Sequence, residues 1–361
     1  MAPRPPVDYN LHGLAGIRLL GASDRDEAAV DRQLGPVKGA LAGEPDLVVR
    51  FVDRLETTGP VRLLGLDDAA FTDNAFLILR GKHKARVRVQ IPLERIGEPG
   101  AEIVCEHGLP AVPLLIACVN LTVLARGALP LHAAAFRHRG TGVVVTGWSK
   151  GGKTEALLAF MAHGAEYVGD EWIYIEPDGR TVHGIPEPIR IWDWNLRQLP
   201  DVRGRVARAD RLRLDGLRIA QTGARGRRGR RVAAVLEGQR HVDVAPERIF
   251  DGGAVALTSS FDRLFLVSSW EQQDTVARTI EPGEVAARMA ASLAYEREPL
   301  DAAYAQFRFA FPDRRNPVLE DAPRRERALL EQVVADKPAH AVDHPYPVDL
   351  AALFAAMEPR C

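Results

Sequence analysis

The chain contains little cysteine, no apolar run long enough to cross a bilayer, and almost no net charge. Its three cysteines show no paired spacing, which argues against a zinc site or a disulfide framework; they are Cys105, Cys118 and Cys361. The first six residues, Met-Ala-Pro-Arg-Pro-Pro, lack the apolar core of a signal peptide. We therefore expect a cytoplasmic protein that does not enter a membrane.

A formal net charge of −1 gives the chain no general attraction for nucleic acid or anionic lipid. The basic exception is the segment 202–231, which ends in Arg225-Gly226-Arg227-Arg228-Gly229-Arg230-Arg231. Because it has almost no apolar residue after Ile219, this segment is predicted to be a flexible loop. It also lacks interleaved aromatic residues, so a loop facing substrate or phosphate is favoured over a nucleic-acid surface.

Residues 147–154, Gly-Trp-Ser-Lys-Gly-Gly-Lys-Thr, satisfy the phosphate-loop pattern G-x-x-x-x-G-K-[ST]. The apolar run 143–146 before them predicts a buried strand, and 155–161 after them has helical periodicity up to Gly164. Glycines let successive backbone N–H groups point at phosphate oxygens, and a helix N-terminus favours negative charge. The nucleotide-binding candidates are Gly147, Ser149, Gly151, Gly152, Lys153 and Thr154.

Within this loop, Lys153 is expected to reach the outer phosphates, and the Thr154 hydroxyl is expected to ligate the Mg²⁺ that bridges them. The strand pattern of 166–175 is interrupted by two adjacent carboxylates, Asp170 and Glu171. A buried carboxylate needs a cation or hydrogen-bond donors, and Lys153 and a magnesium ion are the nearest candidates. Neighbouring strand residues face opposite ways, so the two acids can share one role only if the chain is kinked.

The order of the elements predicts an α/β fold in which a mixed sheet carries the phosphate-loop helix. We expect an α+β portion rich in strands over 1–127 and an ATP-binding domain with a helical C-terminal part over 128–361. A hairpin is predicted from strands at 76–79 and 85–91, and a buried helix over 112–126. Helices are predicted over 282–295, 299–310, 321–335 and 348–357.

Three motifs taken together resemble the C-terminal kinase domain of bacterial HPr serine kinases and their HPr-kinase-like relatives. They are Leu131-His132, the loop 147–154 and Gly169-Asp170-Glu171, and the similarity covers roughly 130–275. The tail at His344-Pro345-Tyr346-Pro347 is similar to the end of HPr-kinase-related proteins from biosynthetic loci. The resemblance implies a fold related to phosphoenolpyruvate carboxykinase.

By this resemblance Asp170 is the catalytic acid/base and His132 an active-site histidine. It also implies that Thr154, Glu171 and Glu187 contact the metal. Two positions depart from the family: Lys150 replaces a loop glycine, and Glu171 replaces the second aspartate of an Asp-Asp pair. The first departure bears on the shape of the loop, and the second bears on metal geometry.

The function expected from these residues is ATP- and Mg²⁺-dependent transfer of the γ-phosphate to a hydroxyl, a serine or threonine of a peptide or small protein. A small-molecule hydroxyl kinase and a nucleotide-binding regulatory module without transfer activity are the alternatives. The N-terminal 125 residues do not resemble the accessory domain of the regulatory kinases, which argues against HPr itself as the substrate. The sequence leaves the oligomeric state open.

Overall fold

The computed structural model describes the chain except for residues 1–3, 36, 82–84, 224–235 and 250–254. By its internal contacts the chain divides into two compact units. The first unit comprises 1–132, 172–185 and 282–337, and the second comprises 133–171, 186–281 and 338–361. The first unit therefore takes in two stretches that lie beyond the boundary expected at residue 127.

The first unit contains an eight-stranded mixed sheet in the order β1-β2-β3-β8-β7-β6-β5-β4, in which only β2-β3 and β3-β8 are parallel pairs. Its strands are β1 Val7–Leu11, β2 Ala15–Leu20, β3 Leu47–Val52, β4 Arg62–Leu64, β5 Ala69–Phe71, β6 Phe76–Arg80, β7 Arg86–Gln90 and β8 Ala101–Glu106. The predicted hairpin is confirmed as the antiparallel pair β6-β7. Val87 and Val89 are buried in it while Arg86 and Arg88 are more exposed, as alternation along a strand requires.

Four helices complete the core of the first unit: α1 Asp24–Leu34, α2 Leu115–Ala125, α9 Pro282–Ala310 and α10 Pro317–Val334. The buried helix predicted over 112–126 is confirmed by α2. Helix is confirmed over both 282–295 and 299–310, but the predicted break between them is wrong, because α9 runs through Pro299 as one helix. Leu300, Tyr304 and Phe307 of α9 belong to the core of this unit, and their packing outweighs the hydrogen bond that proline removes.

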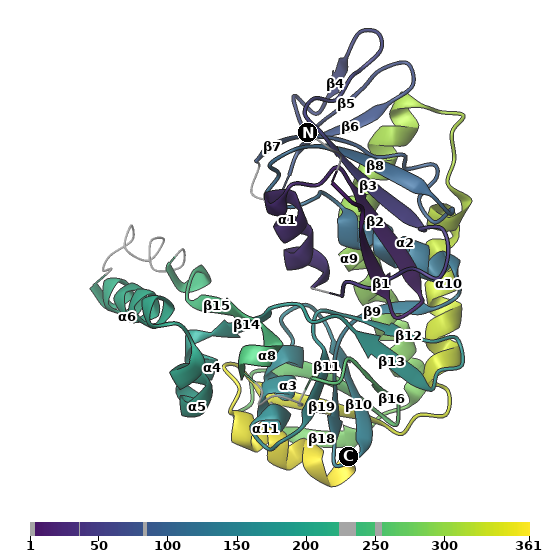
Figure 1. The fold of residues 1–361 in the computed structure, drawn as a ribbon. Coiled ribbons are helices and arrows are strands. Elements are labelled where there is room, and N and C mark those ends of the chain that lie inside the picture. Colours follow the sequence, from purple (N-terminus) through teal and green to yellow (C-terminus); the bar gives the residue numbers. More distant parts are fainter. Residues whose placement is uncertain (1–3, 36, 82–84, 224–235, 250–254) are drawn as a thin grey trace. The chain divides into compact units, whose positions relative to one another are not determined.

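Strand β9 Leu129–His138 contributes residues 133–138 to the second unit. The other main strands of this unit are β10 Thr141–Gly147, β11 Glu166–Gly169, β17 Arg263–Trp270, β18 Val276–Thr279 and β19 Ala339–Pro345. Strand β10 lies between β9, to which it is antiparallel, and β17, to which it is parallel; β17 is also parallel to β19. Helices α3 Lys153–Met161 and α11 Leu350–Met357 pack together against the core of this unit (Figure 1). The fold is thus mixed α/β with multi-stranded mixed sheets, as predicted at that level.

Each unit also contains shorter elements. In the first unit β12 Trp172–Ile175 pairs with β13 Thr181–Gly184 and with the first residues of β9. In the second unit β14 Ile189–Trp192 pairs with β15 His241–Val244. The remaining second-unit elements are β16 Thr258–Ser260, α4 Asp193–Gln198, α5 Pro200–Arg205, α6 Arg208–Gly223, α8 Pro246–Ile249 and the terminal 3₁₀ turn Glu358–Arg360.

The prediction of a flexible loop over the arginine-rich segment is wrong for residues 202–223, which form part of α5 and all of α6. Arg203 donates to Asp215 at 2.9 Å, and Leu214 is fully buried. These contacts, with the buried side chain of Val206, give the segment ion pairs and apolar anchors that composition alone did not reveal. The run from Arg225 to Arg231 lies outside the described residues. No helix in the described ranges is long and apolar enough to cross a membrane.

Candidate nucleotide-binding site

The candidate site begins where buried strand β10 ends at Gly147. This glycine pairs with Val267 of β17 and has φ 155°, a region that side-chain-bearing residues avoid. A Cβ atom built on it would lie 2.4 Å from the carbonyl oxygen of Val267. Any other residue would push β10 and β17 apart, so glycine is required at the start of the loop.

The loop then turns back tightly toward α3. The N–H of Gly151 donates to the carbonyl of Trp148 at 3.0 Å, and Lys150 between them has φ 62°. Lys150 stands where the resemblance expects glycine, and its left-handed conformation is one that glycine adopts freely. The departure therefore leaves the turn intact but at some cost in backbone strain.

Helix α3 begins at Lys153 and has Gly152 as its N-cap. Gly152 has φ 106° and contributes no side chain, so the first N–H groups of α3 meet no cap from that residue. A helix N-terminus of this kind attracts phosphate, since its amides point outward and the helix dipole favours negative charge. The arrangement of β10, loop and α3 fits a nucleotide phosphate.

Lys153 is buried, with 6% of its surface exposed. Its Nζ donates to the carbonyl oxygens of Trp148 and Gly147, at 3.0 and 3.3 Å. The ammonium group is therefore folded back over the loop that it follows. Carbonyl contacts of this kind can be exchanged for phosphate oxygens, which bind an ammonium group more strongly.

Asp170 lies at the end of β11 and is almost fully buried. The Thr154 hydroxyl donates to its Oδ2 at 3.0 Å and lies 3.2 Å from its Oδ1. Burial, followed by the nearby charge of Glu171, raises the pKa of Asp170 to about 7, although Thr154 and Lys153 act in the opposite direction. A carboxyl group with this pKa is suited to accept a proton near neutral pH.

The chain is kinked directly after Asp170, because Glu171 has φ 65° and separates β11 from β12. Glu171 is exposed, and its negative charge raises the pKa of Asp170. The same charge raises the pKa of Arg190, on which Asp243 has a larger effect. Glu187 is half-buried, and its charge, with that of Asp170, adds to the effect of burial in raising the pKa of Tyr167. Within the second unit, Glu171 therefore lies close enough to act on Asp170, and Glu187 lies close enough to act on Tyr167.

The metal role of Thr154, Glu171 and Glu187 stays a prediction. Within the ranges that the structure describes, no three His, Cys, Asp or Glu side chains gather closely enough to hold a metal ion by themselves. Magnesium in nucleotide sites usually takes only one or two protein ligands, with phosphate oxygens and water completing the shell. The Thr154 hydroxyl with Asp170 beside it is a donor set that fits such a site.

His132, the second residue with a predicted catalytic role, belongs to the first unit. There its Nδ1 lies 2.8 Å from Oε1 of Glu296, and its ring is 5.5 Å from that of Trp172. The histidine is thus held by a close contact with the Glu296 carboxylate and by an aromatic neighbour. Its catalytic role stays a prediction.

His344 also belongs to the site, although no sequence motif places it there. It lies in β19, it is 1% exposed, and its Nε2 is 2.9 Å from the carbonyl oxygen of Gly151. Its Nδ1 is 2.9 Å from the carbonyl oxygen of Pro345, so the imidazole ties the phosphate loop to the end of β19. The His-Pro-Tyr-Pro tail was the only signal in the sequence, and nothing in it specifies a partner 193 positions earlier.

Comparisons with protein families and with curated proteins find no match for this chain. The chemistry of the site is therefore inferred from its own residues.

Gly152→Ala tests the fit between the loop and His344. The new Cβ would lie 2.2 Å from Nε2 of His344, at a φ that alanine rarely adopts. We expect the variant to lose about 1–3 kcal/mol of stability from overpacking and to bind ATP more weakly, because the loop must shift. Urea unfolding and calorimetric titration with ATP and Mg²⁺ measure the two effects.

The double variant Gly152→Ala/His344→Ala separates the causes. If the clash with the imidazole dominates, removing the ring restores part of the lost stability, so the two substitutions are not additive. Strictly additive losses would contradict the contact with His344 as the reason for glycine at 152.

Proposed function

We propose that this protein is an ATP- and Mg²⁺-dependent kinase with an HPr-kinase-like, phosphoenolpyruvate-carboxykinase-related phosphate-loop fold. The observation that carries the proposal is the hydrogen bond from Thr154, in the first turn of α3, to the buried carboxylate of Asp170. It joins the end of a phosphate-loop motif to a carboxyl group suited to proton transfer. The acceptor that we propose is a serine or threonine hydroxyl of a peptide or small protein.

Each residue of the loop would have a separate task. The N–H groups of Gly152, Lys153 and Thr154 and the ammonium group of Lys153 would hold the β and γ phosphates. The Thr154 hydroxyl would be a ligand of the magnesium ion, which when bound offsets phosphate charge. His344 would hold the carbonyl side of Gly151 in place, so that the N–H side of the loop remains directed at phosphate.

In the transfer step the acceptor oxygen forms a bond to the γ-phosphorus while the bond from that phosphorus to the β–γ bridging oxygen breaks. The electron pair of the broken bond leaves with ADP, and the proton of the acceptor hydroxyl passes to Asp170. Since Asp170 is buried, its carboxylate is poorly solvated and its affinity for that proton is increased. We further propose a cytoplasmic location, where ATP is available.

The proposal is tested by incubating the protein with γ-labelled ATP, Mg²⁺ and a library of serine- and threonine-containing peptides. We expect label in a peptide. The label should be stable to acid, as serine and threonine phosphate esters are. Label only in a non-peptide hydroxyl compound would shift the activity to the small-molecule alternative. ATP binding without any labelled product would contradict transfer activity and leave a nucleotide-binding module.

A further inference from the structure

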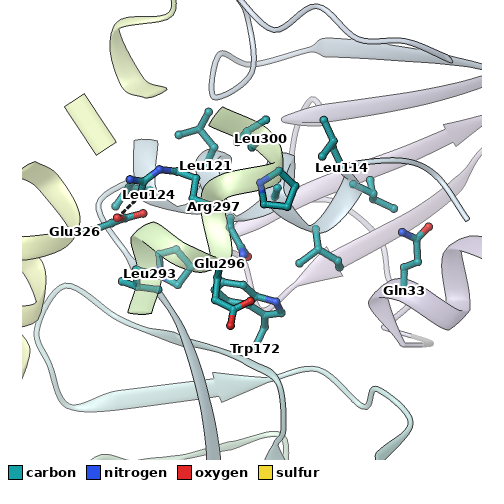
Figure 2. A pocket seen from close by; sticks show the side chains of 16 residues that line it. Gln33, Leu114, Leu121, Leu124, Trp172, Leu293, Glu296, Arg297, Leu300 and Glu326 are labelled. Atoms are coloured by element: carbon teal, nitrogen blue, oxygen red, sulfur yellow. Dashed lines mark hydrogen bonds and ion pairs between the residues drawn. The ribbon is translucent and has the colours of Figure 1, made fainter. Parts of the chain in front are cut away.

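The first unit contains a cavity of about 260 Å³ between α2 and α9. Apolar side chains form most of its wall, among them Leu114, Leu121, Leu124, Leu293 and Leu300 (Figure 2). An apolar cavity of roughly 150 Å³ is already large enough to bind benzene. This cavity therefore has room for an aromatic ring with a short substituent.

One part of the wall contains a positive charge, that of Arg297, which is already paired with carboxylates. Nη1 of Arg297 forms an ion pair with Glu326, which Figure 2 draws as a dashed line. Nε of Arg297 lies 3.2 Å from the carboxylate of Asp301. The side chains of Arg297 and Glu326 are only 10% and 8% exposed. An anionic ligand would meet a guanidinium group that already has two carboxylate partners, and would be repelled by those carboxylates.

A second polar part lies at Glu296 and Trp172, which both line the cavity. His132 connects them, because its Nδ1 is 2.8 Å from the Glu296 carboxylate and its ring centre is 5.5 Å from that of Trp172. The Glu296 side chain keeps 21% of its surface exposed. A carboxylate close to an indole ring is a favourable environment for an ammonium group, through charge-assisted hydrogen bonding and cation–π attraction.

Charge in and behind the wall favours the same kind of ligand. Three carboxylates, those of Glu296, Asp301 and Glu326, accompany the single guanidinium of Arg297. Carboxylates therefore outnumber guanidinium groups among these four side chains, which leaves them with an excess of negative charge. A ligand with one positive charge would reduce that excess, whereas a neutral ligand would leave it unchanged.

We propose that this cavity binds a small organic cation, a primary amine carried on an apolar or aromatic body. The ammonium group would contact Glu296 and Trp172, and the body would fill the space between the leucines of α2 and α9. The inference does not rest on the proposed kinase activity, since every residue that supports it belongs to the first unit.

The test compares three ligands of nearly equal size by calorimetric titration of the full chain: phenethylamine, 2-phenylethanol and 3-phenylpropionate. We expect the amine to bind at least about tenfold more tightly than the alcohol, as one charge-assisted hydrogen bond would provide, and the carboxylate not to bind. Comparable affinities for amine and alcohol, tighter binding of the carboxylate, or no binding of any of the three would each overturn the proposal.

Glu296→Gln locates the ammonium group. The variant should bind phenethylamine about tenfold more weakly while its affinity for 2-phenylethanol stays the same, because only the charged partner is lost. Glu284→Gln, an exposed glutamate in the first turn of the same helix, is the matched control and should change neither affinity. Trp172→Phe, which keeps an aromatic ring, should weaken amine binding only a few-fold. Equal losses for amine and alcohol in Glu296→Gln would contradict the assignment.

Discussion

Replacing Asp170 with asparagine is expected to slow phosphoryl transfer about 10²–10⁴-fold while ATP affinity changes far less. Asparagine keeps the size of the side chain and can still accept the hydrogen bond that Thr154 donates to Asp170. It cannot take up the proton of the attacking hydroxyl. Single-turnover transfer and nucleotide titration on one preparation measure the two quantities.

The Asp170→Asn experiment also separates the roles that a buried carboxylate can have. If Asp170 acts chiefly as a metal ligand, rate and affinity should fall together, and excess Mg²⁺ or Mn²⁺ should restore part of both. Asp243→Asn is the control, because this half-exposed aspartate belongs to the same unit and pairs with Arg190. Full activity in Asp170→Asn would contradict the proposed mechanism.

Lys153→Ala is expected to weaken ATP binding about 10–100-fold, the loss that one or two charge-assisted hydrogen bonds to phosphate would cause. The side chain lies within the loop and donates to the carbonyls of Gly147 and Trp148. Its removal therefore takes away the cation and two contacts that shape the loop. Calorimetric titration with ATP and Mg²⁺ gives the affinity, and thermal unfolding shows whether the variant remains folded.

Lys150→Gly is the matched control for Lys153→Ala, since it removes a lysine charge from the same loop. Lys150 is exposed and has φ 62°, so glycine should relieve backbone strain there and leave ATP affinity unchanged or slightly higher. Equal losses in both variants would mean that charge in general, not the position of Lys153, attracts the nucleotide. Unchanged affinity in a folded Lys153→Ala would contradict the phosphate-loop assignment.

Local order along the chain was predictable. The strand 143–146, the loop and the following helix appear as β10, the loop 147–152 and α3 because hydrophobic periodicity and glycine conformation act over a few residues. The hairpin β6-β7 and the buried helix α2 follow from the same short-range signals. The kink that a shared role of Asp170 and Glu171 requires is present, because Glu171 has φ 65°, and the shared role itself stays a prediction.

Failures of prediction occurred where distant residues compensate for an unfavourable local sequence. Pro299 stays inside α9 because Leu300 and Phe307 pack into the first unit, and α6 forms although its composition is that of a loop. In both cases the unfavourable residues destabilise the helix by a few kcal/mol at most, and the free energy gained from tertiary packing can exceed that cost.

The sequence by itself therefore determined the phosphate-loop pattern, its flanking strand and helix, and the acid pair that follows, because each depends on residues that are neighbours in the chain. Only the tertiary structure brought His344 to Gly151, set Thr154 against Asp170, and placed Trp172, Glu296 and Arg297 around one cavity. Those arrangements depend on which strands pair and which helices pack, and that choice is made by the sum of many long-range contacts that no short stretch of sequence specifies.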